Sequence, residues 1–387
     1  MKKILFVVTD RKSGGVSMVL EDILNNLSLD KYEIDLLIFN DDGNMIVDRI
    51  DNKINIIFGN NFFDTLDIPL SYFKKHFNLR LLFNKLRLMF LLKTGLIKKR
   101  LIKERKKILS KNYDVEIAFK DGFCAIFTSV GDTPKKIHWL HSTYAENDPT
   151  RHYRKVFNTV YEPFENIIAV SKETADGFSS HYGFEDKITV VKNIMDDKKI
   201  KEQGREPVKL SNKKYNFISV GRLASAKGYD RLLKVVSRLK EDGLFNDSFL
   251  TIVGDGPERE NLFTLKDDLK LDCVHFTLNQ INPYKFMAGA DMYISSARCE
   301  PFGLVMGEAL ILNKPVLAVE TSATSTIIND GYNGLITENS ENGLYLMLKK
   351  VLEDEKLVKT LQYNALFYDY SDTNREIVET IENILDK

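Results

Sequence analysis

Short apolar runs alternate with longer amphipathic segments along most of the chain. Runs of this kind predict buried strands, because both faces of a covered parallel sheet contact apolar neighbours. In the first half they lie at 4–8, 34–39, 54–58, 115–119, 136–140, 166–170 and 188–191, with a helical pattern at 16–27. In the second half they lie at 217–220, 250–253, 274–277, 292–295 and 316–319, with the clearest helices at 229–240, 258–269 and 342–352. This alternation predicts an α/β protein with doubly wound parallel sheets.

The length of 387 residues is long for one hydrophobic core and predicts two domains. The segment 198–214 is polar and lysine-rich, contains Gly204 and Pro207, and is expected to link them. We therefore expect domains at 1–197 and 215–365. A C-terminal helix within 366–387 could pack back on the first domain.

The overall composition is that of an ordinary globular protein with a formal net charge of zero, so no global attraction to nucleic acid is expected. The three cysteines show no metal-ligand spacing and fit a reducing compartment. No apolar run approaches the ~20 residues that span a bilayer. The first apolar run is also too short for a secretion signal, which predicts a cytoplasmic protein.

Two carboxylates, Glu300 and Glu308, lie in the segment 299–319, which reads CEPFGLVMGEALILNKPVLAV. A helix is expected to open at Gly303 and to end before the strand that follows Pro315. Glu300 then lies in the loop before the helix, and Glu308 lies one to two turns inside it. The first turn of a helix attracts anions, and a nearby carboxylate can accept hydrogen bonds from sugar hydroxyls. The pattern suits a sugar linked to a phosphate; the alternative for Glu308 is a solvated position on an amphipathic helix.

Two cations stand in the segment FISVGRLASAKGYD at 217–230. A strand is expected to end at Gly221, so Arg222 and Lys227 project from the following loop, and the next helix begins near Gly228. Ligands of open α/β sheets bind beyond the carboxyl ends of strands. Arginine grips phosphate oxygens in a planar fork, and lysine supplies a mobile positive charge. The alternative is an ordinary pair of surface cations.

Two further groups of candidate residues follow strands of the first half. The loop SGGVS at 13–17 contains Gly14 and Gly15, which could adopt positive φ and bring the backbone close to a phosphate. It is not the G-x-G-x-x-G of dinucleotide-binding proteins. His138 and His141 lie in KIHWLHSTY. A structural role is the default for either histidine, although a neutral imidazole can also hydrogen bond a sugar hydroxyl near pH 7.

Together, SGGVS, WLHS, VGR followed by KG, VGDGP and the Glu300–Glu308 pair resemble the motifs of the retaining glycosyltransferase family 4, the glycosyl transferases group 1. The order and spacing also match, most strongly over 215–337. This resemblance implies the GT-B architecture, in which two Rossmann-like domains face each other across a cleft. It further implies transfer of a hexose-type sugar from a nucleotide-sugar, most often a UDP-sugar, to a glycan or lipid-linked acceptor hydroxyl with retention of configuration. The expected setting is synthesis of a bacterial surface polysaccharide such as capsule or O-antigen.

The resemblance also implies roles for individual residues. The first domain would bind the acceptor and the second the donor. Glu300 would bind the donor sugar, Glu308 the ribose, and His141 a sugar hydroxyl. The expected catalytic residues are Glu300, Arg222, Lys227 and His141. The expected donor-binding residues are Gly14, Gly15, Arg222, Lys227, Leu278, Glu300, Gly303, Leu304, Val305 and Glu308. No D-x-D motif stands at an expected strand end, so neither a metal nor another cofactor is expected.

One stretch departs from the family pattern. After Val319 the chain reads ETSATSTIINDGYNG, with Thr326 where the family often has an acidic residue. This puts a carboxylate contact from that loop in doubt. Two other functions stay open: a non-catalytic GT-B subunit that stabilises a partner transferase, and a GT-B epimerase or phosphorylase.

The segment from Tyr72 to Ile108 is unlike its surroundings, because basic residues alternate there with apolar ones at partly helical spacing. Such a segment can lie on an anionic membrane surface. The alternative is a solvated helical face whose apolar stripe packs on the first domain. No nucleic-acid-binding module accompanies it.

Overall fold

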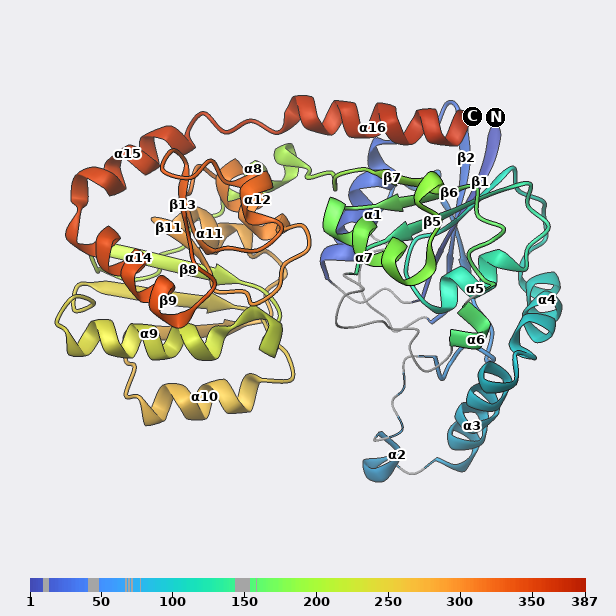
Figure 1. The fold of residues 1–387 in the computed structure, drawn as a ribbon, viewed down its shortest axis with the longest axis horizontal. Helices are drawn as coiled ribbons and strands as arrows, with labels where there is room; N and C mark the ends of the chain where they lie inside the picture. Colours follow the sequence, from blue (N-terminus) through green and yellow to red (C-terminus); the bar gives the residue numbers. More distant parts are fainter. Residues whose placement is uncertain are drawn as a thin grey trace. The chain divides into compact units, whose positions relative to one another are not determined.

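The computed structural model describes residues 1–9, 14–40, 49–66, 68, 70, 72–76, 78–142, 154–157 and 159–387. The chain forms two compact units (Figure 1). The first comprises Met1–Ile194 and Glu376–Lys387, and the second comprises Met195–Arg375. Each unit contains a parallel sheet flanked by helices, which confirms the α/β class predicted from the sequence.

The described part of the first unit contains a seven-stranded parallel sheet in the order β3-β2-β1-β4-β5-β6-β7. The strands are β1 Lys2–Val8, β2 Tyr32–Ile38, β3 Asn55–Phe58, β4 Val115–Ala118, β5 Lys135–Leu140, β6 Asn166–Ala169 and β7 Ile188–Val190. The chain runs outward from β1 to β3 and then resumes at β4 on the other side of β1. The strand order therefore reverses between β1 and β4.

The helices of the first unit cover an apolar core that contains the central strands. They are α1 Gly15–Asn26, α2 Tyr72–Lys75, α3 Leu79–Thr94, α4 Ile97–Ile108, α5 Phe123–Ser129, α6 Arg154–Phe157 and α7 Lys172–Tyr182. Capping residues determine where several of these helices begin or end. Asn78 caps α3 by accepting the Leu81 N–H at 3.1 Å, and Gly95 ends that helix with φ 75°. Ser171 caps α7 by accepting the Thr174 N–H at 3.2 Å, which gives this residue a structural role.

The second unit contains a six-stranded parallel sheet in the order β10-β9-β8-β11-β12-β13. The strands are β8 Tyr215–Val220, β9 Ser248–Val253, β10 Val274–Leu278, β11 Met292–Ser295, β12 Val316–Val319 and β13 Gly334–Thr337. The helices are α8 Asp197–Gly204, α9 Tyr229–Glu241, α10 Arg259–Asp268, α11 Tyr284–Gly289, α12 Leu304–Ile311, α13 Thr324–Ile327, α14 Glu341–Glu353 and α15 Glu355–Ala365. The order of this sheet reverses between β8 and β11.

The boundaries of the units differ from the expected domain limits. The chain passes to the second unit after Ile194, and the segment 198–214, expected as a linker, belongs to that unit. Its helix α8 packs against α11 and α12, and Ile200 is its buried residue. Because Ile200 is the only buried residue of α8, the helix is otherwise polar and its composition resembles that of a linker. The second boundary falls within the last helix, α16 Ser371–Asp386, because Glu376–Lys387 group with the first unit.

Candidate functional site

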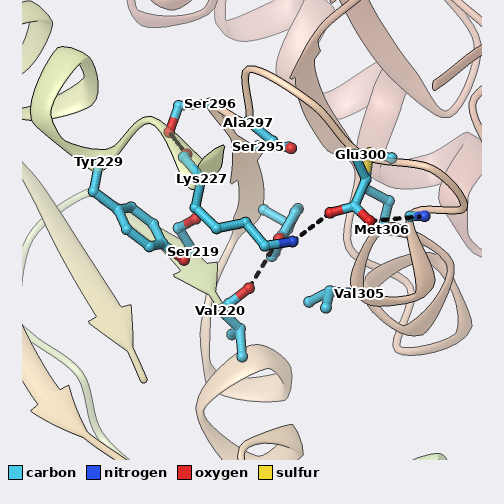
Figure 2. Close-up of a pocket in the computed structure, with 12 residues that line it drawn as sticks. Ser219, Val220, Lys227, Tyr229, Ser295, Ser296, Ala297, Glu300, Val305 and Met306 are labelled. Carbon is cyan, nitrogen blue, oxygen red and sulfur yellow. Dashed lines mark hydrogen bonds and ion pairs between the residues drawn. The ribbon is translucent and has the colours of Figure 1, made fainter. Parts of the chain in front are cut away.

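A pocket lies at the carboxyl ends of β8 and β11, where the strand order of the second sheet reverses (Figure 2). Ligands of open α/β sheets bind at such switch points. The wall of the pocket includes Val220, Lys227, Tyr293, Glu300, Gly303 and Val305. The fold therefore brings together Lys227, Glu300, Gly303 and Val305, which the sequence had singled out separately.

Lys227 and Glu300 form an ion pair at this pocket (Figure 2). Lys227 ends a short 3₁₀ helix, Ser225–Lys227, whereas Glu300 lies in the loop between β11 and α12. The two side chains are only 27% and 17% exposed, so water screens the pair incompletely. Glu300 Oε1 also accepts the Gly303 N–H at 3.3 Å. One carboxylate thus connects the cation of the first loop to the start of α12.

Two glycines allow these loops to approach each other. Gly228 has φ 65°, and a Cβ there would lie 2.1 Å from the Ser296 carbonyl oxygen. Gly303 has φ 80°, and a Cβ there would lie 2.3 Å from Met306 Cε. Positive φ favours glycine at both positions, and at Gly228 the backbone carbonyl also leaves no room for a Cβ, whereas the end of the Met306 side chain can move.

A hydrogen-bond network centred on the buried Arg231 fixes the loop that carries Glu300. Arg231 donates to the Ser296 carbonyl from Nε at 2.9 Å and from Nη2 at 2.7 Å, and to Asn339 Oδ1 at 2.8 Å. Asn339 Nδ2 in turn donates to the Arg298 carbonyl at 3.2 Å. Ser296 Oγ donates to the Lys227 carbonyl at 3.0 Å, which joins the two loops directly. The distance between Lys227 and Glu300 is therefore set by the backbone as well as by their charges.

Helix α12 places backbone donors and a second carboxylate next to this pair. The N–H groups of Leu304 and Val305 lie in its first turn, where no intrahelical acceptor is available. Glu308 lies one turn further along and is only 7% exposed. Its Oε1 accepts the Tyr284 hydroxyl at 3.1 Å. Glu308 is therefore not a solvated position on an amphipathic helix.

Arg222 follows β8 and Leu278 ends β10, two strands separated by β9, and neither residue lines the pocket. Arg222 lies two residues after β8 and is exposed, and its guanidinium makes no hydrogen bond or ion pair with any residue that the structure describes. Leu278 ends β10 after an irregularity in its pairing with β9, and its φ is 57°. Its carbonyl accepts the Gly254 N–H at 2.9 Å. This left-handed conformation is unusual for leucine and fixes the backbone at that strand end.

Three tyrosines of the site were not identified from the sequence. Tyr229 and Tyr293 line the pocket, and burial raises the pKa of both hydroxyls well above its usual value. Both hydroxyls are therefore neutral donors at pH 7, and Tyr293 donates to the Val220 carbonyl at 3.3 Å. The third, Tyr284, holds Glu308. In the sequence, a tyrosine in a buried strand or at a helix start cannot be distinguished from an ordinary core residue. Its place in the site becomes clear only once the pairing of the strands is known.

The glycine loop of the first unit follows β1, at the reversal of strand order. Ser13 lies outside the described residues. Gly14 does not use the freedom of glycine to adopt positive φ, because its φ of 174° is extended backbone that any residue can adopt. Gly15 begins α1 and is not among the glycines with positive φ. A Cβ on Gly14 would meet no atom within 4 Å, so packing within the chain does not require glycine there.

His141 follows β5, and its Nε2 is buried without a hydrogen-bond partner among the described residues. Burial is the largest influence on its imidazole and lowers the pKa to about 4, so the ring is neutral at pH 7. Its ring centroid lies 4.8 Å from that of Phe119. His138 is fully buried, with Nδ1 3.3 Å from the Ala118 carbonyl oxygen and Nε2 3.5 Å from Asp121 Oδ1. These contacts fit the structural role expected for His138.

Within the described ranges, no group of His, Cys, Asp and Glu side chains is arranged to hold a metal ion. A search of the same residues finds no helix with the length and apolarity needed to cross a membrane.

Residues 200–366 match the family described as Glycosyl transferases group 1. Over 214 residues, the chain is 28% identical to the N-acetylgalactosamine-N,N'-diacetylbacillosaminyl-diphospho-undecaprenol 4-alpha-N-acetylgalactosaminyltransferase of Campylobacter jejuni, a match that covers 54% of this chain and 57% of that protein. An uncharacterized glycosyltransferase of Haemophilus influenzae is 26% identical over 399 residues, which cover 100% of this chain and 99% of that one. The chain spans about half the length of the first curated relatives that it matches.

Among solved structures, HepE of Anabaena in complex with UDP and glucose superposes with a TM-score of 0.69 at 19% identity, covering 99% of this chain and 100% of that chain. At this identity the likeness concerns the fold alone. It confirms the predicted GT-B class with two Rossmann-like domains.

Proposed function

We propose that this chain is a glycosyltransferase that uses a nucleotide-sugar donor, a proposal supported by the match of residues 200–366 to the family Glycosyl transferases group 1. The observation that carries the proposal is the Lys227–Glu300 ion pair in a pocket at the switch point of the second sheet. A cation, a carboxylate and the first turn of a helix are the groups that a sugar linked to a diphosphate requires.

In the proposed complex, the diphosphate engages Lys227, Arg222 and the first-turn N–H groups of Leu304 and Val305. Lys227 exchanges its contact with Glu300 for a phosphate oxygen, and the exposed Arg222 adds a second positive charge. The UDP bound to HepE, a protein of the same fold, supports UDP as the nucleotide.

Each of the two carboxylates is proposed to bind a different sugar ring of the donor. Glu300 accepts hydrogen bonds from hydroxyls of a hexose-type sugar, and Glu308, held by Tyr284, accepts those of the ribose. The base lies near Leu278, where backbone groups provide the contacts. The first unit contributes Gly14, Gly15 and the neutral imidazole of His141 as further donor contacts.

The proposed reaction retains the anomeric configuration. The acceptor hydroxyl attacks the anomeric carbon on the face from which the diphosphate leaves. The new C–O bond takes the place of the bond to the phosphate oxygen, and the acceptor proton passes to the leaving diphosphate. Lys227 and Arg222 stabilise the negative charge that develops on the leaving group, so no metal ion is required.

The proposed acceptor is a hydroxyl of a glycan or lipid-linked sugar in bacterial surface polysaccharide synthesis, such as capsule or O-antigen. The Campylobacter relative is named for a sugar carried on diphospho-undecaprenol, and another relative is named a lipopolysaccharide core biosynthesis glycosyltransferase. We propose that the protein acts in the cytoplasm at the inner face of the membrane, where the segment from Tyr72 to Ile108 would meet the lipid.

The test is donor consumption and transfer by the purified chain with an undecaprenol-diphosphate-linked sugar. Proton NMR of the product gives the configuration of the new anomeric centre. We expect retention, activity in EDTA, and loss of at least 100-fold in Lys227→Ala but not in Lys234→Ala, an exposed lysine of α9. An inverted product would exclude the proposed reaction, and loss in EDTA restored by magnesium would exclude metal independence. Donor consumption without acceptor, or only with free phosphate, would indicate an epimerase or phosphorylase instead.

A further inference from the structure

Helix α3 exposes a continuous apolar stripe. Leu79, Phe83, Leu86 and Phe90 are 70%, 67%, 51% and 59% exposed. Their spacing of four, three and four residues puts them on one face of the helix. The opposite face contains Leu88, which is 3% exposed and belongs to the core of the first unit. The helix is therefore anchored to its unit by one side while the other side presents large apolar groups to solvent.

Cations surround this stripe. Arg80, Arg87 and Lys93 of α3 are exposed, and α3 contains no acidic residue. On α4, Lys99, Lys103 and Lys106 are exposed and share a face with Ile102, which is 43% exposed. The single acidic residue of α4, Glu104, is buried and paired with Arg100 and Lys107. The whole chain has equal numbers of acidic and basic residues, so this positive charge is a local feature.

We propose that α3 and α4 dock the protein on the surface of an anionic lipid bilayer. Leu79, Phe83, Leu86 and Phe90 enter the boundary between headgroups and acyl chains, and the lysines of α4 contact the headgroups. An anionic bilayer offers both an apolar layer for the stripe and a layer of negative charge for the cations. A nucleic acid would bind the cations but leave the apolar side chains of the stripe in water. A protein partner with a mixed surface charge would not require a surface that is almost entirely positive.

The position of α3 and α4 in the first unit is compatible with docking. Figure 1 shows α3 and α4 at the periphery of the first unit. Docking here would deepen the proposed function by bringing a lipid-linked acceptor close to the enzyme. The docking itself does not depend on that function, because it can be measured without any sugar.

The experiment is co-sedimentation of the full-length protein with vesicles of phosphatidylcholine alone and with 30% phosphatidylglycerol. We expect partitioning to the anionic vesicles that falls at least ten-fold in F83E/F90E. The matched control is Phe367→Glu, which removes an aromatic side chain that is 62% exposed in the second unit. The triple change K99Q/K103Q/K106Q should also weaken partitioning and make it less sensitive to salt, whereas K356Q/K359Q in α15 should not.

Because the substituted side chains are exposed, thermal unfolding should be unchanged, which separates docking from misfolding. Equal partitioning of wild type and F83E/F90E would overturn the proposal. So would a wild-type dimer that F83E/F90E converts to monomers without lipid, since the stripe would then be a contact between two copies. Binding of the donor nucleotide should be identical in all these variants, so a failure of the transferase proposal would be recognised separately.

Discussion

Replacing Glu300 by glutamine should change the affinities for a nucleoside diphosphate and for its nucleotide-sugar in opposite directions. A diphosphate that engages Lys227 must compete with Glu300 for the same ammonium group. Surface ion pairs contribute about 0.2–1 kcal/mol, and this one is partly shielded, so its loss should favour the diphosphate by about 1 kcal/mol. That is roughly a five-fold tighter Kd.

The nucleotide-sugar should behave differently, because Glu300 is proposed to bind the sugar. Hydrogen bonds to a charged group are worth about 1.5–3 kcal/mol, more than the gain at Lys227. The nucleotide-sugar should therefore bind roughly five-fold more weakly to Glu300→Gln.

Isothermal titration calorimetry with UDP and the UDP-sugar measures both values. Glu260→Gln on α10 removes a carboxylate that is 90% exposed and should change neither. If UDP bound Glu300→Gln less tightly than wild type, Lys227 would not be a diphosphate ligand and the account of the pocket would be wrong.

Three further predictions concern the support of the site. Tyr284→Phe removes the hydroxyl that Glu308 accepts at 3.1 Å, and by the magnitude of hydrogen bonds to charged groups it should raise the donor Kd about ten-fold; calorimetry would show an unchanged Kd if Tyr284 only packs. Gly228→Ala should destabilise the second unit by about 2 kcal/mol more than Gly243→Ala, because both have left-handed φ but only a Cβ on Gly228 meets backbone, and equal urea midpoints would contradict this. The lowered pKa of His141, about 4 against 6.5, means that the unfolded chain takes up the proton first. The contribution of His141 to stability is therefore complete above pH 6.5 and is lost between pH 6.5 and 4, by up to about 3 kcal/mol. The single tryptophan, Trp139, reports urea unfolding of the first unit, and His141→Gln should flatten this pH dependence whereas the exposed His275→Gln should not.

Much of the fold could be predicted because its strands are buried on both faces. The apolar runs at 217–220 and 292–295 correspond closely to β8 and β11. Helix α8 could not be predicted, because a lysine-rich helix that buries only Ile200 has the composition of a linker. Strand β13, Gly334–Thr337, is short and begins with glycine, so its sequence carries little strand signal.

For the site, the sequence indicated Lys227 and Glu300 separately through their positions after strands. Their ion pair depends on the parallel pairing of β8 with β11, which brings together loops 73 residues apart. The same reasoning explains why Tyr284 was missed, since its link to Glu308 joins α11 to α12. The donor contact predicted for Gly14 stays a prediction, and its extended backbone does not require glycine.

The central claim is that the second unit binds a nucleotide-sugar through Arg222 and Lys227. The most direct measurement is thermal stabilisation of the purified protein by a panel of UDP-, GDP-, ADP- and CMP-sugars. Ligand at 100 times its Kd stabilises the folded state by about 2.7 kcal/mol, which is readily seen as a shift in Tm. We predict a shift with one class of donor, most directly the UDP-sugars, that is lost in Arg222→Ala and kept in Arg205→Ala, another exposed arginine of this unit. A folded protein that no donor stabilises would contradict the claim and favour a non-catalytic subunit.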